Sequence, residues 1–117
     1  MPLKSLRPKN LAQMLVSALF LATPDVAVAK EQTFNKPSFK YGGITGVISL
    51  VRLDWCWNHQ QMCGMRAADL YCKSRGFQKV GAFSKDPAIG ATVSMGDKTV
   101  CNKGVCDGFA SITCQGP

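Results

Sequence analysis

The sequence predicts a small α+β domain, with one short helix packed on an antiparallel sheet of four or five strands. One amphipathic helical pattern occurs at residues 64–75, and several short β-like runs alternate with turn residues. The chain also has six cysteines in 117 residues. Short exported chains with an even number of cysteines use disulfides to stabilise a core that is too small to be stable alone. We therefore expect the domain to be disulfide-rich.

The strongest predicted strand is Val47–Trp55, because apolar residues alternate along it. We expect Val47, Val51, Leu53 and Trp55 to share one face of it. Turn residues at Asp86–Gly90 and at Gly96–Asp97 separate the later β-like runs. These later strands are expected at 77–83, 91–95, 98–101 and 109–114.

The predicted helix, Gly64–Arg75, has apolar residues at helical spacing. Its inner face is expected to contain Met65, Ala68 and Cys72. On the outer face, Asp69 and Lys73 are spaced for an ion pair, and Gly76 is placed for a left-handed cap at the end. A helix this short must dock on a sheet to be stable.

Residues 1–29 have the three parts of a secretory signal peptide. A basic start precedes an apolar stretch at 11–22, and the small residues Ala27 and Ala29 precede the expected cleavage site. We expect cleavage after Ala29 and secretion to the extracellular space, or to the periplasm if the source is a bacterium. The alternative is a leader that is retained as an anchor, although its apolar stretch is short for a bilayer.

Cleavage would leave 117 − 29 = 88 residues, with all six cysteines. Residues 30–43 show no hydrophobic period and include Pro37, Gly42 and Gly43, so we expect a flexible or extended lead-in. The cysteine-rich domain is expected at 44–117. No apolar run is long enough to span a bilayer, so no transmembrane segment is expected after cleavage. We expect the protein to be a monomer.

The order of the cysteines favours one pairing among many, although sequence alone does not choose. Asn and Gly between Cys101 and Cys106 would bring these two cysteines together in a hairpin, and a polar loop separates Cys56 from Cys63. The remaining pair would tie the helix to the last strand. The favoured disulfides are therefore Cys101–Cys106, Cys56–Cys63 and Cys72–Cys114.

Zinc binding is the alternative use of these cysteines, because the spacing of Cys101 and Cys106 lies within the range of zinc sites. The other cysteine spacings do not match, and His59 is the single histidine. We therefore expect no metal and no cofactor.

Five motifs follow one another between Gly43 and Cys114: DWC, CG, AADLYCKSRGF, C-x4-C and GFASITC. In this order they resemble a small secreted six-cysteine domain of plant and microbial proteins of unassigned activity, and more distantly the scavenger receptor cysteine-rich domain. The second similarity implies a binding module and a disulfide between Cys72 and Cys114. The chain lacks that domain's tryptophan-glycine-threonine strand and its doubled aspartates, and a shared fold does not transfer function.

Residues for catalysis are sparse in this sequence, so we assign no catalytic residue and favour a protein that is not an enzyme. Glu31 lies in the lead-in, and His59 lies in a polar loop. A small secreted hydrolase stays the alternative function, because two aspartates could meet as a glycosidase pair or His59 could act as a general base. The aspartates are isolated in sequence: Asp54, Asp69, Asp86, Asp97 and Asp107.

The chain is basic, which favours anionic partners. Its net charge is +7, and the leader has three basic residues and one acidic residue, so the mature chain has +7 − 2 = +5. We expect an extracellular or cell-surface ligand, either an anionic polysaccharide or a protein. No nucleic-acid motif is present, and we expect no nucleic-acid partner.

Trp55 and Trp57 lie two residues apart and would project from one face of a strand. They would form an aromatic platform for a ligand or, alternatively, cover the disulfide of Cys56 as part of the core. The predicted ligand-binding residues are Trp57, Lys73 and Arg75. Trp57 begins a loop, and the two basic residues lie at the exposed end of the helix. The sequence thus predicts a secreted cysteine-rich module for binding or defence.

Overall fold

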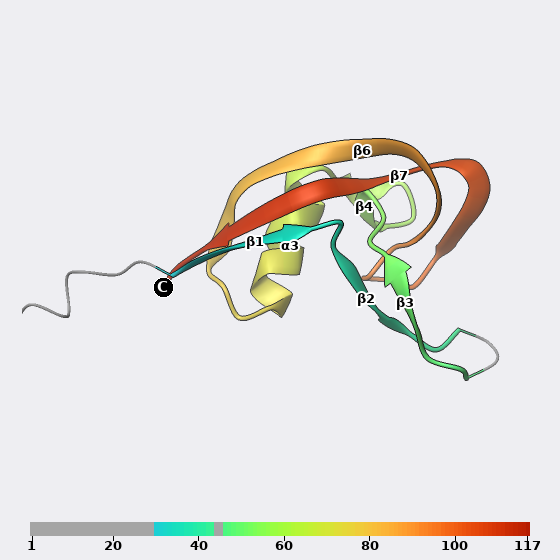
Figure 1. Cartoon of the computed structure of the whole chain (residues 1–117), viewed down its shortest axis with the longest axis horizontal. Coiled ribbons are helices and arrows are strands. Elements are labelled where there is room, and N and C mark those ends of the chain that lie inside the picture. Colours follow the sequence, from blue (N-terminus) through green and yellow to red (C-terminus); the bar gives the residue numbers. More distant parts are fainter. Residues whose placement is uncertain (1–29, 44–45) are drawn as a thin grey trace, which may run out of the picture.

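The computed structural model of the chain describes residues 30–43 and 46–117 (Figure 1). The predicted signal peptide lies outside the described residues, so its cleavage stays a prediction. The described part contains one helix and seven strands. In chain order they are β1 (Glu31–Asn35), β2 (Ser38–Tyr41), β3 (Ser49–Arg52), β4 (Cys56–Asn58), β5 (Gln61–Cys63), α3 (Met65–Ser74), β6 (Lys79–Val93) and β7 (Val100–Gln115). The predicted class, a small disulfide-rich α+β domain, is confirmed.

The strands form three antiparallel groups in place of the single sheet that we expected. The main sheet has the order β1-β7-β6, and two hairpins are formed by β2 with β3 and by β4 with β5. Helix α3 lies against one face of the main sheet, and the β2–β3 hairpin projects away from the body of the protein (Figure 1). The hairpin therefore stands apart from the helix and main sheet that form most of the domain.

Strands β6 and β7 are 15 and 16 residues long, and each contains two of the short strands that we expected. The predicted turn at Gly96–Asp97 lies between them. The loop predicted at Asp86–Gly90 is instead an irregularity within β6, where the pairing register with β7 shifts. Gly90 has a φ of 103° there, so the strand accommodates extra residues without leaving the sheet.

Residues 30–43, which we expected to be a flexible lead-in, form β1 and β2. Strand β1 pairs with the end of β7, from Glu31 opposite Gln115 to Asn35 opposite Ser111. This pairing brings the two ends of the described chain together, at a pole far from the β2–β3 hairpin (Figure 1). The segment is extended, but it is part of the domain and not a flexible lead-in. The prediction of flexibility relied on the missing hydrophobic period, whereas single aromatic residues such as the buried Phe39 anchor these strands.

The strand predicted at Val47–Trp55 is shorter in the structure. It ends at Arg52, after which Leu53 and Asp54 form isolated bridges to β6 and β7. Leu53 is fully buried, as the alternation predicts, but Val47, which was expected on the same face, is 72% exposed. At Val47 the hairpin has already left the body of the protein, so the apolar alternation there does not correspond to burial.

Helix α3 is close to its predicted bounds and has glycine at both ends. Gly64 precedes it with a φ of 64°, and a Cβ atom there would lie 3.1 Å from the Trp55 ring. After the helix, the N–H groups of Gly76 and Phe77 donate to carbonyls of the last turn at 3.1 and 3.0 Å. This is a Schellman motif with Gly76 in the left-handed position, as predicted.

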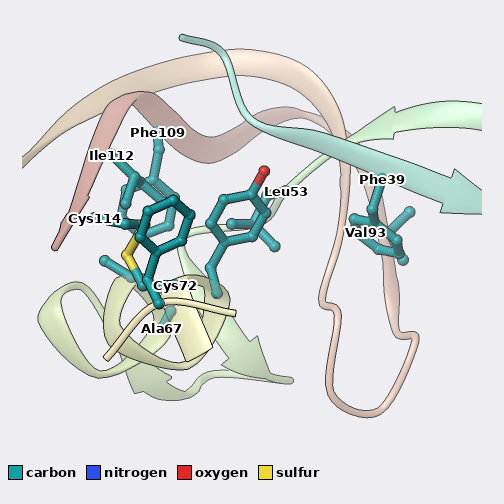
Figure 2. Close-up of a cluster of buried hydrophobic side chains, with 11 residues drawn as sticks. Phe39, Leu53, Ala67, Cys72, Val93, Phe109, Ile112 and Cys114 are labelled. Carbon is teal, nitrogen blue, oxygen red and sulfur yellow. A yellow bond between two sulfur atoms is a disulfide. The ribbon is translucent and has the colours of Figure 1, made fainter. Parts of the chain in front are cut away.

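The core lies between α3 and the main sheet (Figure 2). Met65, which was expected on the inner face of the helix, is 60% exposed, and Ala67 is buried in its place. Phe39 and Val93 extend the core toward the β2–β3 hairpin (Figure 2). The largest fully buried side chains are Tyr71, Phe109, Leu53, Ile112, Thr92, Cys72 and Cys114.

The disulfides have the pairing that the sequence favours, namely Cys56–Cys63, Cys72–Cys114 and Cys101–Cys106. The buried Cys72–Cys114 bond connects α3 to the central strand of the main sheet. Cys101–Cys106 does not close a hairpin, as we expected, but an excursion within β7. Its two cysteines lie opposite Thr92 and Gly90 of β6, so residues 102–105 bulge out of the strand.

The disulfides indicate an oxidising compartment, because such bonds persist outside the reducing cytosol. None of the cysteines is free within the part of the chain that the structure describes. Over residues 30–43 and 46–117, no helix has both the length and the apolar character needed to cross a membrane.

Replacing Cys72 and Cys114 together by alanine should lower the melting temperature more than replacing Cys101 and Cys106. The first pair is 42 residues apart and the second 5. In the chain-entropy model these loops correspond to about 4 and about 2 kcal/mol. Thermal unfolding followed by circular dichroism should show a difference of roughly 10 °C between the two variants. A smaller loss in the Cys72, Cys114 variant would contradict its role as the main tether.

Candidate functional site

A cavity of about 420 Å³ opens between the β2–β3 hairpin, the end of α3 and the turn between β6 and β7. Apolar side chains in its wall come from Phe39, Leu50 and Met95, and its cations are Lys40, Arg75 and Lys98. We call it the basic cavity. Each of its three sides comes from a different part of the sequence, so the folded chain is needed to form it.

The cations of the basic cavity have no acidic residue beside them in its wall. The ion pairs of the described chain use other cations, in the pairs Arg52–Asp86, Lys73–Asp69 and Lys85–Asp107. Like charges that converge on a concave surface raise the local positive potential and attract anions. The basic cavity is therefore suited to an anionic ligand.

Arg75 follows α3 and joins its end to β2. Its Nη2 atom donates a hydrogen bond to Ser38 O at 3.0 Å, and its guanidinium lies 5.1 Å from the centre of the Tyr71 ring. These contacts fix the side chain, since a cation over an aromatic face is attracted to it. A guanidinium has five N–H donors, so donors remain for a ligand.

Lys98 lies on the turn between β6 and β7. Its backbone N–H donates to Ser94 O at 2.9 Å, and its Nζ atom lies 5.7 Å from the centre of the Phe39 ring. Asp97 holds the turn in place, because its carboxylate accepts hydrogen bonds from the N–H groups of His59 and Thr99 at 2.9 and 3.1 Å. The hydrogen bond from His59 is the main cause that lowers the pKa of Asp97.

Of the three predicted ligand-binding residues, Arg75 alone lines the basic cavity. Lys73 forms the predicted ion pair with Asp69 on the outer face of α3. Trp57 packs against the core, and its ring lies beside Gly96, whose N–H donates to Trp57 O at 2.8 Å. Trp57 therefore supports the turn that carries Lys98, and the structure does not group it with Lys73 and Arg75.

Trp55 and Trp57 do not form the aromatic platform that we considered. Trp55 packs on Phe109, with ring centres 4.7 Å apart, and on Phe83, at 5.8 Å. The aromatic ring pairs in the described ranges include none between the two indoles. Both tryptophans are partly buried against the core, which agrees with the structural interpretation.

A second cavity, of about 190 Å³, has Asp54 and His59 in its wall, which are groups that a hydrolase would need. Asp54 is fixed by the protein itself. One carboxylate oxygen accepts a hydrogen bond from Cys56 N–H at 2.8 Å, and the other accepts one from the Thr92 hydroxyl. Asp54 therefore has a structural role, connecting the start of β4 to β6.

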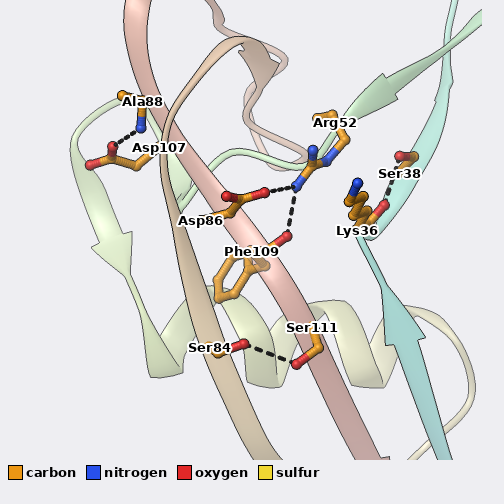
Figure 3. Close-up of polar contacts among 9 residues, drawn as sticks. All are labelled: Lys36, Ser38, Arg52, Ser84, Asp86, Ala88, Asp107, Phe109 and Ser111. Atoms are coloured by element: carbon orange, nitrogen blue, oxygen red, sulfur yellow. Dashed lines mark hydrogen bonds and ion pairs between the residues drawn. The ribbon is translucent and has the colours of Figure 1, made fainter.

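Further aspartates also have structural partners (Figure 3). Asp86 pairs with Arg52 at 3.1 Å, and Asp107 accepts a hydrogen bond from Ala88 N–H at 2.9 Å. The hydrogen bond from Ala88 is the main cause that lowers the pKa of Asp107. In the same way, the hydrogen bond from Lys73 is the main cause that lowers the pKa of Asp69. A general acid at neutral pH needs a raised pKa instead. No group of three or more His, Cys, Asp or Glu side chains in the described residues is placed to hold a metal ion.

Comparisons of the chain with protein-family models, with curated proteins and with solved structures give no match. The resemblance to secreted six-cysteine domains and to scavenger receptor domains therefore stays an expectation. A function has to be argued from the site itself, because it is the site and not the fold that determines what a protein binds.

Sequence reasoning missed Lys40 and Lys98. Lys40 was placed in the expected lead-in, and Lys98 was placed at the start of the strand expected at 98–101. The Gly96–Asp97 signal did predict a surface turn, but nothing in the sequence showed that this turn faces the β2–β3 hairpin. The proximity of Lys40 and Lys98 depends on the bridge between Leu53 and Val93, which is a tertiary contact.

Gly96→Ala should destabilise the protein. A Cβ atom at Gly96 would clash with Asn58 Oδ1 and would lie 2.5 Å from the Trp57 ring, so the amide and the half-buried indole would have to move. We expect a loss of about 1–3 kcal/mol in the free energy of unfolding, measured in urea. The control is Gly42→Ala, where the nearest atom is 3.8 Å away and the change should cost less than about 0.5 kcal/mol. Equal stability of the two variants would show that Trp57 does not support the turn.

Asp97→Asn should make the protein less sensitive to acid. Because hydrogen bonds lower the folded-state pKa of Asp97, its ionised form adds stability above the ordinary carboxyl pKa of about 4. This contribution is lost as the pH falls through the lower folded-state value. The variant should therefore be less stable near neutral pH and should lose less stability below about pH 4. Urea unfolding over a pH series measures this, with Glu31→Gln as the control. The prediction is contradicted if the free energies of unfolding of wild type and Asp97→Asn fall in the same way at acid pH.

Proposed function

We propose that this chain is exported, loses residues 1–29 and acts as a small extracellular binding module whose ligand site is the basic cavity. The proposed ligand is an acidic polysaccharide of a cell surface or wall. The observation that carries the proposal is the convergence of Lys40, Arg75 and Lys98 on one cavity whose wall contains no acidic residue.

The chemistry of the basic cavity suits a charged sugar chain. Carboxylate or sulfate groups accept hydrogen bonds from a guanidinium and from ammonium groups, and these charge-assisted bonds are the stronger kind. Leu50 and Met95 supply apolar surface beside the cations, which suits the C–H faces of a sugar ring. Arg75 is already held by Ser38 and Tyr71, so less side-chain freedom is lost on binding.

Export is supported by the leader-like pattern of residues 1–29 and by the disulfides. The alternative of a small secreted hydrolase has weaker support. Both oxygens of Asp54, which shares the wall of the second cavity with His59, accept hydrogen bonds from the protein. Release of reducing ends from the polysaccharides tested below would contradict a purely binding role.

Changing both Lys40 and Lys98 to glutamine should weaken binding of the oxidised protein to polygalacturonate or dextran sulfate by about tenfold at low ionic strength. The difference should shrink as salt is added, because exposed charges are screened. Isothermal titration calorimetry measures the affinity, with neutral dextran as the ligand control.

The matched protein control is Lys79→Gln with Lys103→Gln. It removes the same charge from the start of β6 and from the Cys101–Cys106 excursion, outside the wall of the basic cavity. This variant should bind nearly as wild type. An equal loss in both double variants would mean that net charge, and not the basic cavity, determines binding.

A further inference from the structure

The end of the β2–β3 hairpin exposes an unusual amount of apolar surface. Val47, Ile48 and Leu50 are 72%, 66% and 70% exposed. Single exposed hydrophobic residues are normal on a soluble protein, but a group on a projecting element marks an interaction surface. We call residues 46–50 the apolar arm, which extends from the body of the protein (Figure 1).

Cations lie at the base of the apolar arm and not along it. The sequence has no charged residue from Tyr41 to Val51. Lys40 lies directly opposite Leu50 in the hairpin, and Leu50 borders the basic cavity together with Arg75 and Lys98. Leu50 also borders a cavity of about 310 Å³ whose wall is mostly apolar. The hairpin therefore changes from apolar at its end to basic at its base.

We infer that the apolar arm inserts into the interface of an anionic lipid bilayer, with the cations of the basic cavity level with the lipid phosphates. Apolar insertion and attraction to anionic lipids each give weak binding, and together they hold a protein on a membrane. The inference shares the three cations with the proposed function and rests on it to that extent. It adds a second contact surface, the arm itself.

The geometry favours a bilayer over a second copy of the chain. A second copy of the chain would offer no anion to the three cations of the basic cavity, and both copies would have a mature net charge of +5. A bilayer supplies the opposite charge and needs no complementary groove. Because the hairpin has two strands and its outer edges lack a full set of strand partners, its backbone polar groups restrict insertion to the hydrated interface.

Vesicle sedimentation of the oxidised protein tests the inference. Wild type should bind vesicles of phosphatidylcholine with phosphatidylglycerol and should bind pure phosphatidylcholine poorly. Ile48→Ser with Leu50→Ser should weaken this binding roughly tenfold or more, because each change removes apolar area that would be buried. Val105→Ser changes an equally exposed residue in the Cys101–Cys106 excursion, 70% exposed, and should bind as wild type.

Fluorescence measures insertion directly. An Ile48→Trp variant should be quenched by phospholipids brominated on their acyl chains, and a Val105→Trp variant should not, each compared with wild type to subtract Trp55 and Trp57. Quenching of both variants alike would overturn insertion by the arm.

The remaining outcomes separate the inference from the proposed function. Binding to acidic polysaccharide without binding to anionic vesicles would overturn the inference and leave the proposed function standing. Vesicle binding without polysaccharide binding would overturn the proposed ligand and support the inference. Unchanged vesicle binding in the Ile48→Ser, Leu50→Ser variant would overturn the inference. A wild-type dimer that the double serine variant abolishes, seen by analytical ultracentrifugation, would assign the arm to a second copy and also overturn it.

Discussion

The covalent bond between Cys72 and Cys114 is the constraint on which the rest of the structure depends. Helix α3 has ten residues and would not be stable alone in water. The bond ties it to β7, the strand that pairs with both β1 and β6. Small buried residues, Ala67 and Ala68, let the helix lie close to the sheet. One cross-link and a compact set of buried side chains thus take the place of a large core.

The site is a consequence of this frame. Arg75 is positioned because α3 ends where it does, and its bond to Ser38 then links the helix to the β2–β3 hairpin. The turn with Lys98 forms the remaining side of the basic cavity. Gly96 in this turn donates a hydrogen bond to Trp57 O, and Asp97 accepts one from His59 N–H. The cations of the basic cavity therefore converge because the elements that carry them are separately fixed, and no ligand is needed to assemble them.

Local signals in the sequence predicted their parts of the fold well. Gly76 marked the end of the helix, and the spacing of the cysteines favoured the pairing observed. Features that depend on tertiary contact could not be predicted. The segment 30–43 becomes strand only because β7 and β3 offer edges to it. Trp57 was predicted as a ligand contact because it begins the loop to Cys63, while Gly96, whose contact with the indole decides its role, is distant in sequence.

The pairing of β1 with the end of β7 gives the molecule a direction. Gly116 N–H donates to Lys30 O at 2.8 Å, so both ends of the described chain lie at one pole, opposite the apolar arm (Figure 1). A label, fluorophore or solid support attached after Pro117 would be held at the pole away from the arm. Molecules immobilised in this way would present the arm to the solution.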